Sequence, residues 1–351
     1  MENQNQTPHK RRVRYKGKYP KKFEEKYKEL QPEKYKDTIE HVIQKGNTPA
    51  GMHISIMVKE ILDFLNIQPG ETGFDATLGY GGHTKAMLQC LNGKGHIYAT
   101  DVDPEESAKT KKRLAEQGFG EELLTVKLQN FCTIDEIAKE VGGFDFILAD
   151  LGVSSMQIDN PKRGFSFKTD GPLDLRLNQE TGISAAQRLD TISREELAGM
   201  LCENSDEPYC EELAKAITDE IRRGNHIDTT TKLRQVIEKT LDFLPEKEKK
   251  ETIKKTCQRT FQALRIDVNH EFEVLYEFME KLPDALKPGG RVAILTFHSG
   301  EDKLVKKALK AGYKAGIYSD YAKDVIRPSA QECAQNGRAR STKMRWAIKA
   351  R

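Results

Sequence analysis

Apolar and polar positions follow two different periods in the part of the chain that precedes residue 157. Short apolar runs predict strands over 73–78, 96–100, 123–128 and 144–149. Segments with helical spacing or helix-compatible composition precede or separate these runs over 53–65, 84–91 and 107–117. The run 144–149 is apolar almost throughout, which is typical of a parallel strand buried on both faces. Strands that alternate with helices predict a doubly wound α/β domain.

The pattern changes between residues 157 and 256, where a loop with mixed charges leads into helical segments. The expected helices of this region cover 193–202, 211–223 and 232–244. The α/β pattern then returns with a helix over 272–282, a turn at 287–290, a strand over 292–297 and a last strand around Trp346. We therefore predict one Rossmann-like domain made of residues 51–156 and 257–351. Residues 157–256 are expected to form an inserted helical subdomain for substrate recognition, and residues 1–50 a basic extension.

A glycine-crowded turn follows the first predicted strand. Gly79, Gly81 and Gly82 lie between that strand and the helix over 84–91, so the backbone can bend sharply and approach a ligand closely. The helix behind the turn directs unpaired N–H groups at the same place. Asp101 ends the second predicted strand about 20 residues later, where an acidic side chain can hold a ribose hydroxyl. The pattern favours a nucleoside cofactor, although a glycine turn also occurs in many other α/β proteins.

The spacing of the glycines distinguishes between nucleoside cofactors. A dinucleotide fingerprint requires a third small residue where this chain has Thr84. Asp75 precedes the turn, and its charge would face a pyrophosphate of the same sign. A cationic, phosphate-free cofactor such as S-adenosyl-L-methionine fits this sequence better.

Polar and aromatic residues follow the predicted strands at their carboxyl ends. Ligands of open α/β sheets bind at this edge, so Asp75, Asp101, Phe131 and Asp150 are expected to converge on one crevice. Phe131 is expected to lie against an adenine ring. His298 follows the strand over 292–297, where it is either a structural residue or part of the site.

Composition and charge narrow the class of protein. The chain has 351 residues, of which 37% are hydrophobic and 32% charged, and no run is long enough to span a membrane. The first 22 residues lack the apolar core of a signal peptide, so a cytoplasmic location is expected. Six cysteines without a Cys-x-x-Cys pair predict neither a zinc site nor a disulfide framework.

The net charge of +3 is distributed unevenly. Between His9 and Lys22 the chain has no acidic residue, and Tyr15 and Tyr19 interleave the basic side chains Lys10, Arg11, Arg12, Arg14, Lys16, Lys18, Lys21 and Lys22. Such a segment can neutralise phosphates and stack on bases, which favours an RNA partner. A solvated tail that only improves solubility is the alternative.

Six ordered motifs resemble the bacterial small-subunit (16S) ribosomal RNA cytosine-N4 methyltransferases. They are DATLGYGGHT at 75–84, DLGVSSMQ at 150–157, RGFSF…DGPLDLR at 163–176, RTFQALRI at 259–266, FHS at 297–299 and RARS at 338–341. The resemblance implies a class I S-adenosylmethionine-dependent methyltransferase with an inserted helical domain. It also implies methylation of the exocyclic N4 amine of a cytidine in the decoding region. The cofactor contacts that it implies are Gly81, Gly82, His83, Asp101, Phe131, Asp150 and Gln157.

The chain departs from the family pattern mainly in its substrate half. It has about 50 additional N-terminal residues, Lys255-Thr256 stands where His-Pro is common, and Gly300 replaces a leucine after the FHS motif. A paralogue that methylates another RNA is therefore an alternative. A second alternative is a ribosome-assembly factor that binds rRNA with little activity. A DNA-modifying enzyme is disfavoured because Asp150 does not begin the Pro-Pro-Tyr motif of DNA amino-methyltransferases.

The chemistry of a cytosine amine indicates which residues act on it. Its lone pair is delocalised into the ring, so the enzyme has to align the amine and offer acceptors to its N–H groups. Asp150 and the loop through Ser154 are the expected acceptors, and His298 is a further candidate. The target base is expected to be flipped out or single-stranded. The side chains available for stacking on it are Tyr80, Phe165 and Phe167, and the alternative for the two phenylalanines is that hydrophobic packing pins their loop.

Overall fold

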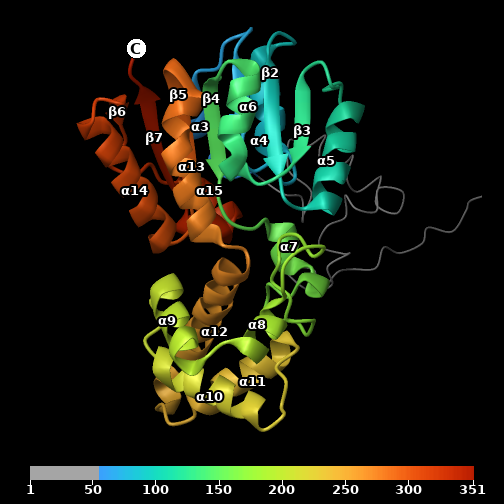
Figure 1. Cartoon of the computed structure of the whole chain (residues 1–351), viewed down its shortest axis with the longest axis vertical. Coiled ribbons are helices and arrows are strands. Elements are labelled where there is room, and N and C mark those ends of the chain that lie inside the picture. The colour runs from blue at the N-terminus through green and yellow to red at the C-terminus, as the bar shows by residue number, and fades with distance from the viewer. Residues whose placement is uncertain (1–54) are drawn as a thin grey trace, which may run out of the picture. The chain divides into compact units, whose positions relative to one another are not determined.

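The computed structural model describes residues 55–351, so the predictions made for the basic extension lie outside the described residues. Seven strands form one sheet in the order β3-β2-β1-β4-β5-β7-β6 (Figure 1). Their bounds are Thr72–Asp75 (β1), His96–Asp101 (β2), Leu124–Leu128 (β3), Phe144–Asp150 (β4), Leu286–Thr296 (β5), Tyr318–Tyr321 (β6) and Lys343–Lys349 (β7). Strands β1 to β5 pair in parallel, whereas β7 is antiparallel to both β5 and β6. The predicted α/β architecture is confirmed.

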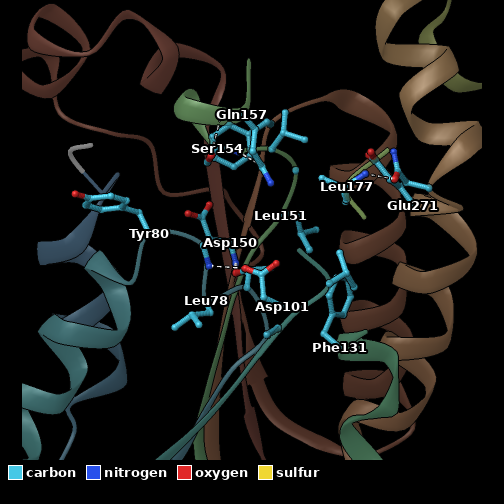
Figure 2. A pocket seen from close by; sticks show the side chains of 18 of the residues that line it. Leu78, Tyr80, Asp101, Phe131, Asp150, Leu151, Ser154, Gln157, Leu177 and Glu271 are labelled. Carbon is cyan, nitrogen blue, oxygen red and sulfur yellow. Dashed lines mark hydrogen bonds between the residues drawn. The ribbon is translucent and has the colours of Figure 1, made fainter. Parts of the chain in front are cut away.

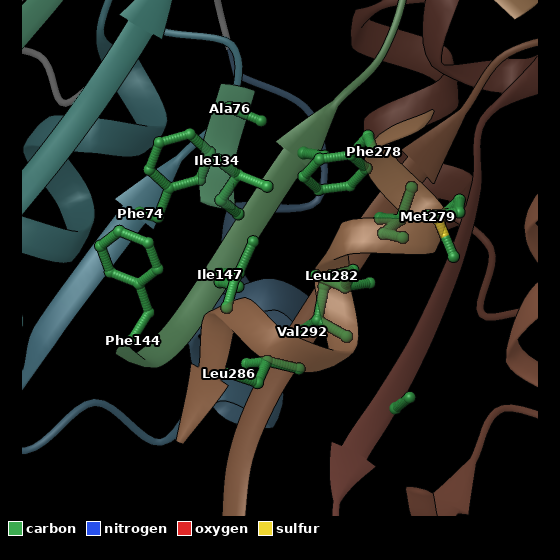
Figure 3. Close-up of a cluster of buried hydrophobic side chains, with 14 of the residues drawn as sticks. Phe74, Ala76, Ile134, Phe144, Ile147, Phe278, Met279, Leu282, Leu286 and Val292 are labelled. Carbon is green, nitrogen blue, oxygen red and sulfur yellow. The ribbon is translucent and has the colours of Figure 1, made fainter. Parts of the chain in front are cut away.

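Successive residues of the central strands point alternately into two hydrophobic layers, one on each face of the sheet. Val292 and Ile294 of β5 join the cluster under one group of helices, and Ala293 and Leu295 join the cluster on the opposite face. The first group comprises α6 (Ile134–Val141), α13 (Glu271–Ala285) and α14 (Ser299–Lys314). The second comprises α3 (Val58–Leu65), α4 (Gly82–Leu91) and α5 (Pro104–Glu116). Figure 3 shows the first cluster, in which the ring of Phe74 lies beside Ile134 of α6 and packs on the ring of Phe144.

Two features of the half of the sheet that contains β5, β7 and β6 differ from the sequence prediction. The segment 287–290 is not a free turn but part of β5, whose pairing with β4 shifts between Phe144 and Phe146. Gly289 has a φ of +76° within this irregular stretch. Strand β6 was not predicted, because it is a short edge strand in which only Tyr318 is fully buried.

Five helices form a lobe with a hydrophobic core of its own. They are α8 (Ala185–Thr191), α9 (Arg194–Ser205), α10 (Cys210–Arg222), α11 (Thr230–Thr240) and α12 (Glu246–Val268) (Figure 1). We call these helices the helical lobe. The chain enters the lobe after β4 and returns to β5, which pairs directly with β4. The predicted subdomain boundary at residue 256 falls inside α12, which continues unbroken to Val268. None of the helices among residues 55–351 is long and apolar enough to cross a membrane.

Of the two phenylalanines expected to stack on a base, Phe165 belongs to the core of the helical lobe and Phe167 packs against that core. Phe165 is only 8% exposed and lies in the lobe's hydrophobic cluster. The ring of Phe167 packs edge to face on Phe261, with 5.8 Å between ring centroids. Hydrophobic packing therefore fixes this loop, and the stacking prediction is wrong for Phe165.

Candidate active site

A pocket of about 380 Å³ lies at the carboxyl edge of β1, β2, β4 and β5. All the residues predicted for the site except Asp75 line it, namely Gly81, Gly82, His83, Asp101, Phe131, Asp150, Ser154, Gln157 and His298. Figure 2 shows Asp101 and Asp150 near its centre, Tyr80 on one side, and Phe131 on the other. The topology therefore brings together residues from strands that are far apart in the sequence.

The glycine turn is shaped by close neighbours. Gly79 and Gly81 have φ angles of +48° and +77°, in the region that favours glycine. A Cβ atom on Gly81 would lie 2.7 Å from the Thr110 side chain, and one on Gly82 would lie 2.0 Å from Ser55 Oγ. A side chain at Gly81 would therefore be strained, whereas one at Gly82 would require the Ser55 side chain to move. Helix α4 begins at Gly82.

Asp101 is a buried acceptor that fixes the turn. Its Oδ2 accepts the backbone N–H of Gly79 at 2.8 Å, and its Oδ1 accepts that of Asp103 at 2.9 Å. Burial raises the pKa of the Asp101 carboxyl to about 6, against the opposing effect of these two hydrogen bonds. Each oxygen has a second lone pair, so the carboxylate can still accept a ribose hydroxyl.

Asp75 does not take part in the pocket as expected, and this prediction is wrong. It is 1% exposed, and it is not among the residues that line the pocket. Its Oδ2 accepts the Thr84 hydroxyl at 2.6 Å and its Oδ1 accepts the Thr77 N–H at 3.0 Å. The reason is strand alternation, because Asp75 points to the face opposite to Phe74 and Ala76. Its carboxylate thus bonds to Thr77 before the glycine turn and to Thr84 after it, and so stabilises the turn.

Ser154 and Gln157 hold each other at the start of α7 (Ser155–Asp159). The Ser154 hydroxyl accepts the Gln157 N–H at 3.2 Å, and the Gln157 carboxamide oxygen accepts the Ser154 N–H at 2.9 Å. This is a capping box, which fixes the loop after β4. The Gln157 amide also donates to Asp103 Oδ2 at 3.1 Å. The loop is therefore anchored to the end of β2.

Phe131 and Tyr80 are held by aromatic contacts on either side of the pocket. Phe131 begins a short 3₁₀ helix (Phe131–Thr133), and its ring packs edge to face on Phe278 with 5.2 Å between centroids. The guanidinium of Arg113 lies 3.5 Å from the centroid of the Tyr80 ring. A ring held in this way is prepared for contact with a planar ligand.

Asp150 carries an unused acceptor. Its backbone N–H donates to Thr77 Oγ1 at 2.8 Å, and its Oδ2 lies 3.4 Å from His83 Nδ1. Its Oδ1 is buried and has no hydrogen-bond partner within residues 55–351. An unpaired carboxylate oxygen beside a pocket can accept an N–H or O–H donor from a ligand or from water. This is the strongest chemical feature of the site.

His298 is part of a helix cap. Its Nδ1 accepts the Glu301 N–H at 3.5 Å, and its Nε2 lies 3.2 Å from Glu301 Oε1 without hydrogen-bond geometry. Its ring packs edge to face on Phe272, with 5.7 Å between centroids. These contacts begin α14 and supply a structural reason for a histidine at this position.

Sequence reasoning did not assign the wall of the pocket that comes from α12 and α13. Gln262, Arg265 and Asn269 line it at helical spacing, which places them on one face of α12 and at its end. Arg265 donates to both oxygens of Glu271, at 2.7 and 2.9 Å. Two of these residues stand in the motif at 259–266, so the combination of that motif with helical periodicity was the available signal.

Comparison with known proteins decides between the classes that such a pocket can serve. The sequence model of the MraW methylase family matches residues 50–350 of this chain. The chain belongs to the MraW methylase family. It is therefore a methyltransferase with the Rossmann-like class I fold, and S-adenosyl-L-methionine is its methyl donor. The family resemblance of the sequence motifs is confirmed.

Several curated relatives of this methylase align over most of its length. Ribosomal RNA small subunit methyltransferase H 1 of Agathobacter rectalis is 87% identical over 97% of this chain and 98% of its own. The protein of the same name from Lachnoclostridium phytofermentans is 72% identical over 99% of this chain and 95% of its own. Ribosomal RNA small subunit methyltransferase H of Acidobacterium capsulatum is 36% identical over 85% of this chain and 98% of its own. The first two alignments cover 97% and 99% of this chain, so they include most of the N-terminal extension. These two relatives therefore share the extension.

Proposed function

We propose that this methylase transfers a methyl group to the exocyclic N4 amine of a cytidine in small-subunit (16S) rRNA. The printed names of its relatives support rRNA of the small subunit as the substrate. The orphaned Oδ1 of Asp150 supports an amine as the acceptor of the methyl group, because it offers an acceptor to an N–H group inside the pocket. The substrate would be met in the cytoplasm, as rRNA or as an assembled small subunit.

The pocket fits the cofactor through residues of this chain. Asp101 offers carboxylate oxygens to ribose hydroxyls, and Phe131 offers a ring edge or face to an adenine. The glycine turn brings backbone close to the ligand without a phosphate-binding fingerprint. Asp150 and Asp101 both favour a cationic ligand over an anionic one. When bound, S-adenosylmethionine supplies an electrophilic methyl group.

The residues around Asp150 would serve the target amine. A cytosine amine becomes nucleophilic only as its nitrogen pyramidalises and one proton leaves. Asp150 Oδ1 is the acceptor for that proton, and the capped loop through Ser154 fixes the approach of the base. His298 is a weaker candidate than Asp150, because its Nδ1 caps α14.

The experiment that tests this proposal identifies the product. Purified protein and methyl-labelled S-adenosylmethionine are incubated with small ribosomal subunits from a strain that lacks the corresponding gene. The RNA is then digested and the labelled nucleoside is identified. Labelled N4-methylcytidine at one site is the expected result. Absence of label on both subunits and naked RNA, with measurable cofactor binding, would favour the assembly-factor alternative, and label on another RNA would favour the paralogue.

A further inference from the structure

His83 lies between two acceptors at the floor of the pocket. Its Nε2 is 2.9 Å from the carbonyl oxygen of Ile56, and its Nδ1 is 3.4 Å from Oδ2 of Asp150. The residue is 7% exposed. Both ring nitrogens are therefore already engaged with protein atoms, and the imidazole has no free polar atom to offer a cofactor.

Only the protonated ring satisfies both neighbours. A neutral imidazole donates from one nitrogen, whereas an imidazolium donates from both. The charged groups that face the ring are Asp150 and, below it, Asp75. Burial opposes the charge, but the hydrogen bond and the charge of Asp150, with the Ile56 carbonyl and Asp75, outweigh it and raise the pKa of His83. The surroundings thus favour an imidazolium paired with Asp150.

The pairing leaves the two oxygens of Asp150 in different situations. Oδ2 faces His83, while Oδ1 is buried without a partner among the residues that the structure describes. The backbone of Asp150 is held independently, by the hydrogen bond from its N–H to Thr77. The rotation of the Asp150 carboxylate about its Cβ–Cγ bond is therefore determined mainly by the contact with His83.

We propose that His83 is a positioning residue for methyl transfer, which holds Oδ2 of Asp150 so that Oδ1 faces the target amine. This inference rests on the proposed function. In the reaction the N4–CH₃ bond forms as the bond from that methyl to sulfur breaks. One N4–H bond also breaks, and its proton passes to Asp150 Oδ1 and then to water. His83 keeps its own protons throughout, so its effect is on the orientation of the acceptor.

Two uncharged variants separate the two hydrogen bonds of His83. The amide nitrogen of asparagine can occupy the position of Nδ1, and that of glutamine the position of Nε2. His83→Asn therefore keeps a donor to Asp150, and His83→Gln keeps a donor to the Ile56 carbonyl. We expect His83→Gln to lower kcat about tenfold or more below that of His83→Asn. The Kd for S-adenosylmethionine should be similar in both variants.

Equal kcat values in the two variants would overturn the inference, as would a loss in His83→Gln that appears only in the Kd for the cofactor. Methylation by the wild type is measured in the same assay. A wild type that labels no RNA would reject the proposed function, and the pairing would then be judged by a measurement that needs no activity.

That measurement is a titration of ¹⁵N-labelled histidine in the cofactor-free protein by nuclear magnetic resonance. We expect the titration midpoint of His83 to lie above that of a free imidazole, because the pKa of this ring is raised. In Asp150→Asn the titration midpoint of His83 should move to lower pH, because the neutral amide no longer stabilises the imidazolium. An unchanged midpoint would show that Asp150 does not hold the ring, and would reject the inference whatever the substrate.

Discussion

Three aspartates at the ends of neighbouring strands differ in the hydrogen bonds that surround them. Asp75 is buried, and both of its oxygens are used by Thr77 and Thr84. Asp101 accepts two backbone N–H groups and retains lone pairs toward the pocket. Asp150 has one oxygen without a partner in the described part of the chain. Residue type alone would give the three the same role, whereas their neighbours distinguish the supporting Asp75 from Asp101 and Asp150, for which we propose cofactor binding and chemistry.

Cofactor binding should depend on the ionisation of Asp101. Its carboxyl has a pKa of about 6 in the free protein, so it loses its charge, and part of its ability to accept ribose hydroxyls, as the pH falls through this value. We expect the Kd for S-adenosylmethionine to be about tenfold higher at pH 5 than at pH 8. Isothermal titration calorimetry at both values measures this. In Asp101→Asn binding should be weak at both, and a wild-type Kd that does not change with pH would contradict the assignment.

Removal of the acceptor at Asp150 should affect the chemical step. Asp150→Asn retains a polar side chain of the same size, but a neutral amide cannot take up the amine proton. We expect kcat to fall by about 10² to 10⁴. Single-turnover methylation of small subunits measures the loss, and circular dichroism checks that the variant is folded. Full activity in this folded variant would remove Asp150 from the mechanism.

At the scale of elements, Asp103 joins three segments at the edge of the pocket. It caps α5 by accepting the N–H groups of Glu105 and Glu106. Its Oδ2 also accepts hydrogen bonds from the Arg163 guanidinium at 2.7 Å and from the Gln157 amide at 3.1 Å. These bonds connect the end of β2 to α7 and to the chain that leads into the helical lobe. Arg163 continues the connection by donating to the carbonyl of Leu177. The cofactor edge and the lobe are thus linked through one buried ion pair.

Breaking this ion pair should destabilise the protein strongly. The side chains of Arg163 and Asp103 are 8% and 1% exposed, so Arg163→Met leaves an uncompensated buried charge. We expect the free energy of unfolding to fall by about 3 kcal/mol or more. The denaturant midpoint measures this change.

The control for that experiment is an exposed ion pair of the same domain. Lys111 and Glu121 are 48% and 83% exposed, so Lys111→Met should leave the denaturant midpoint nearly unchanged. Similar losses in the two variants would mean that the pair at Asp103 does not anchor the loop.

Elements with a strong period were predictable, and those that depend on tertiary contact were not. The apolar run of β4 identified a central strand, because a strand buried on both faces has to be apolar. Strand β6 escaped prediction because only its first residue is buried. The rule for carboxyl ends placed Asp101 and Asp150 correctly but failed for Asp75, since it ignores which face a strand residue points to. The wall from α12 depends on how the lobe returns to the sheet, which no local pattern specifies.

At the scale of the whole molecule, a run of unopposed positive charge lies outside the described residues. The stretch from His9 to Lys22 contains eight Lys or Arg and no acidic residue, against a net charge of only +3 for the chain. Replacing these eight residues by glutamine should weaken binding to small-subunit rRNA. It should also reduce the slope of log affinity against log salt, because fewer counterions are released. Filter binding at several salt concentrations measures both.

The cofactor provides the control for this prediction. The pocket lies within residues 55–351, so its Kd for S-adenosylmethionine should be unchanged in the glutamine variant. An unchanged salt slope would instead support a segment that only improves solubility.

The pairing of β4 with β5 also governs when the enzyme can become active during its own synthesis. β4 ends at Asp150, but its neighbour begins only at Leu286, after the entire helical lobe. Until that second strand emerges from the translating ribosome, the central strand has an open edge that other chains can join. Such a nascent chain has the glycine turn and Asp150 but lacks His298 and the other pocket residues that follow β5. We therefore expect methylation to await a nearly finished polypeptide, because the site is complete only after β5 has paired with β4.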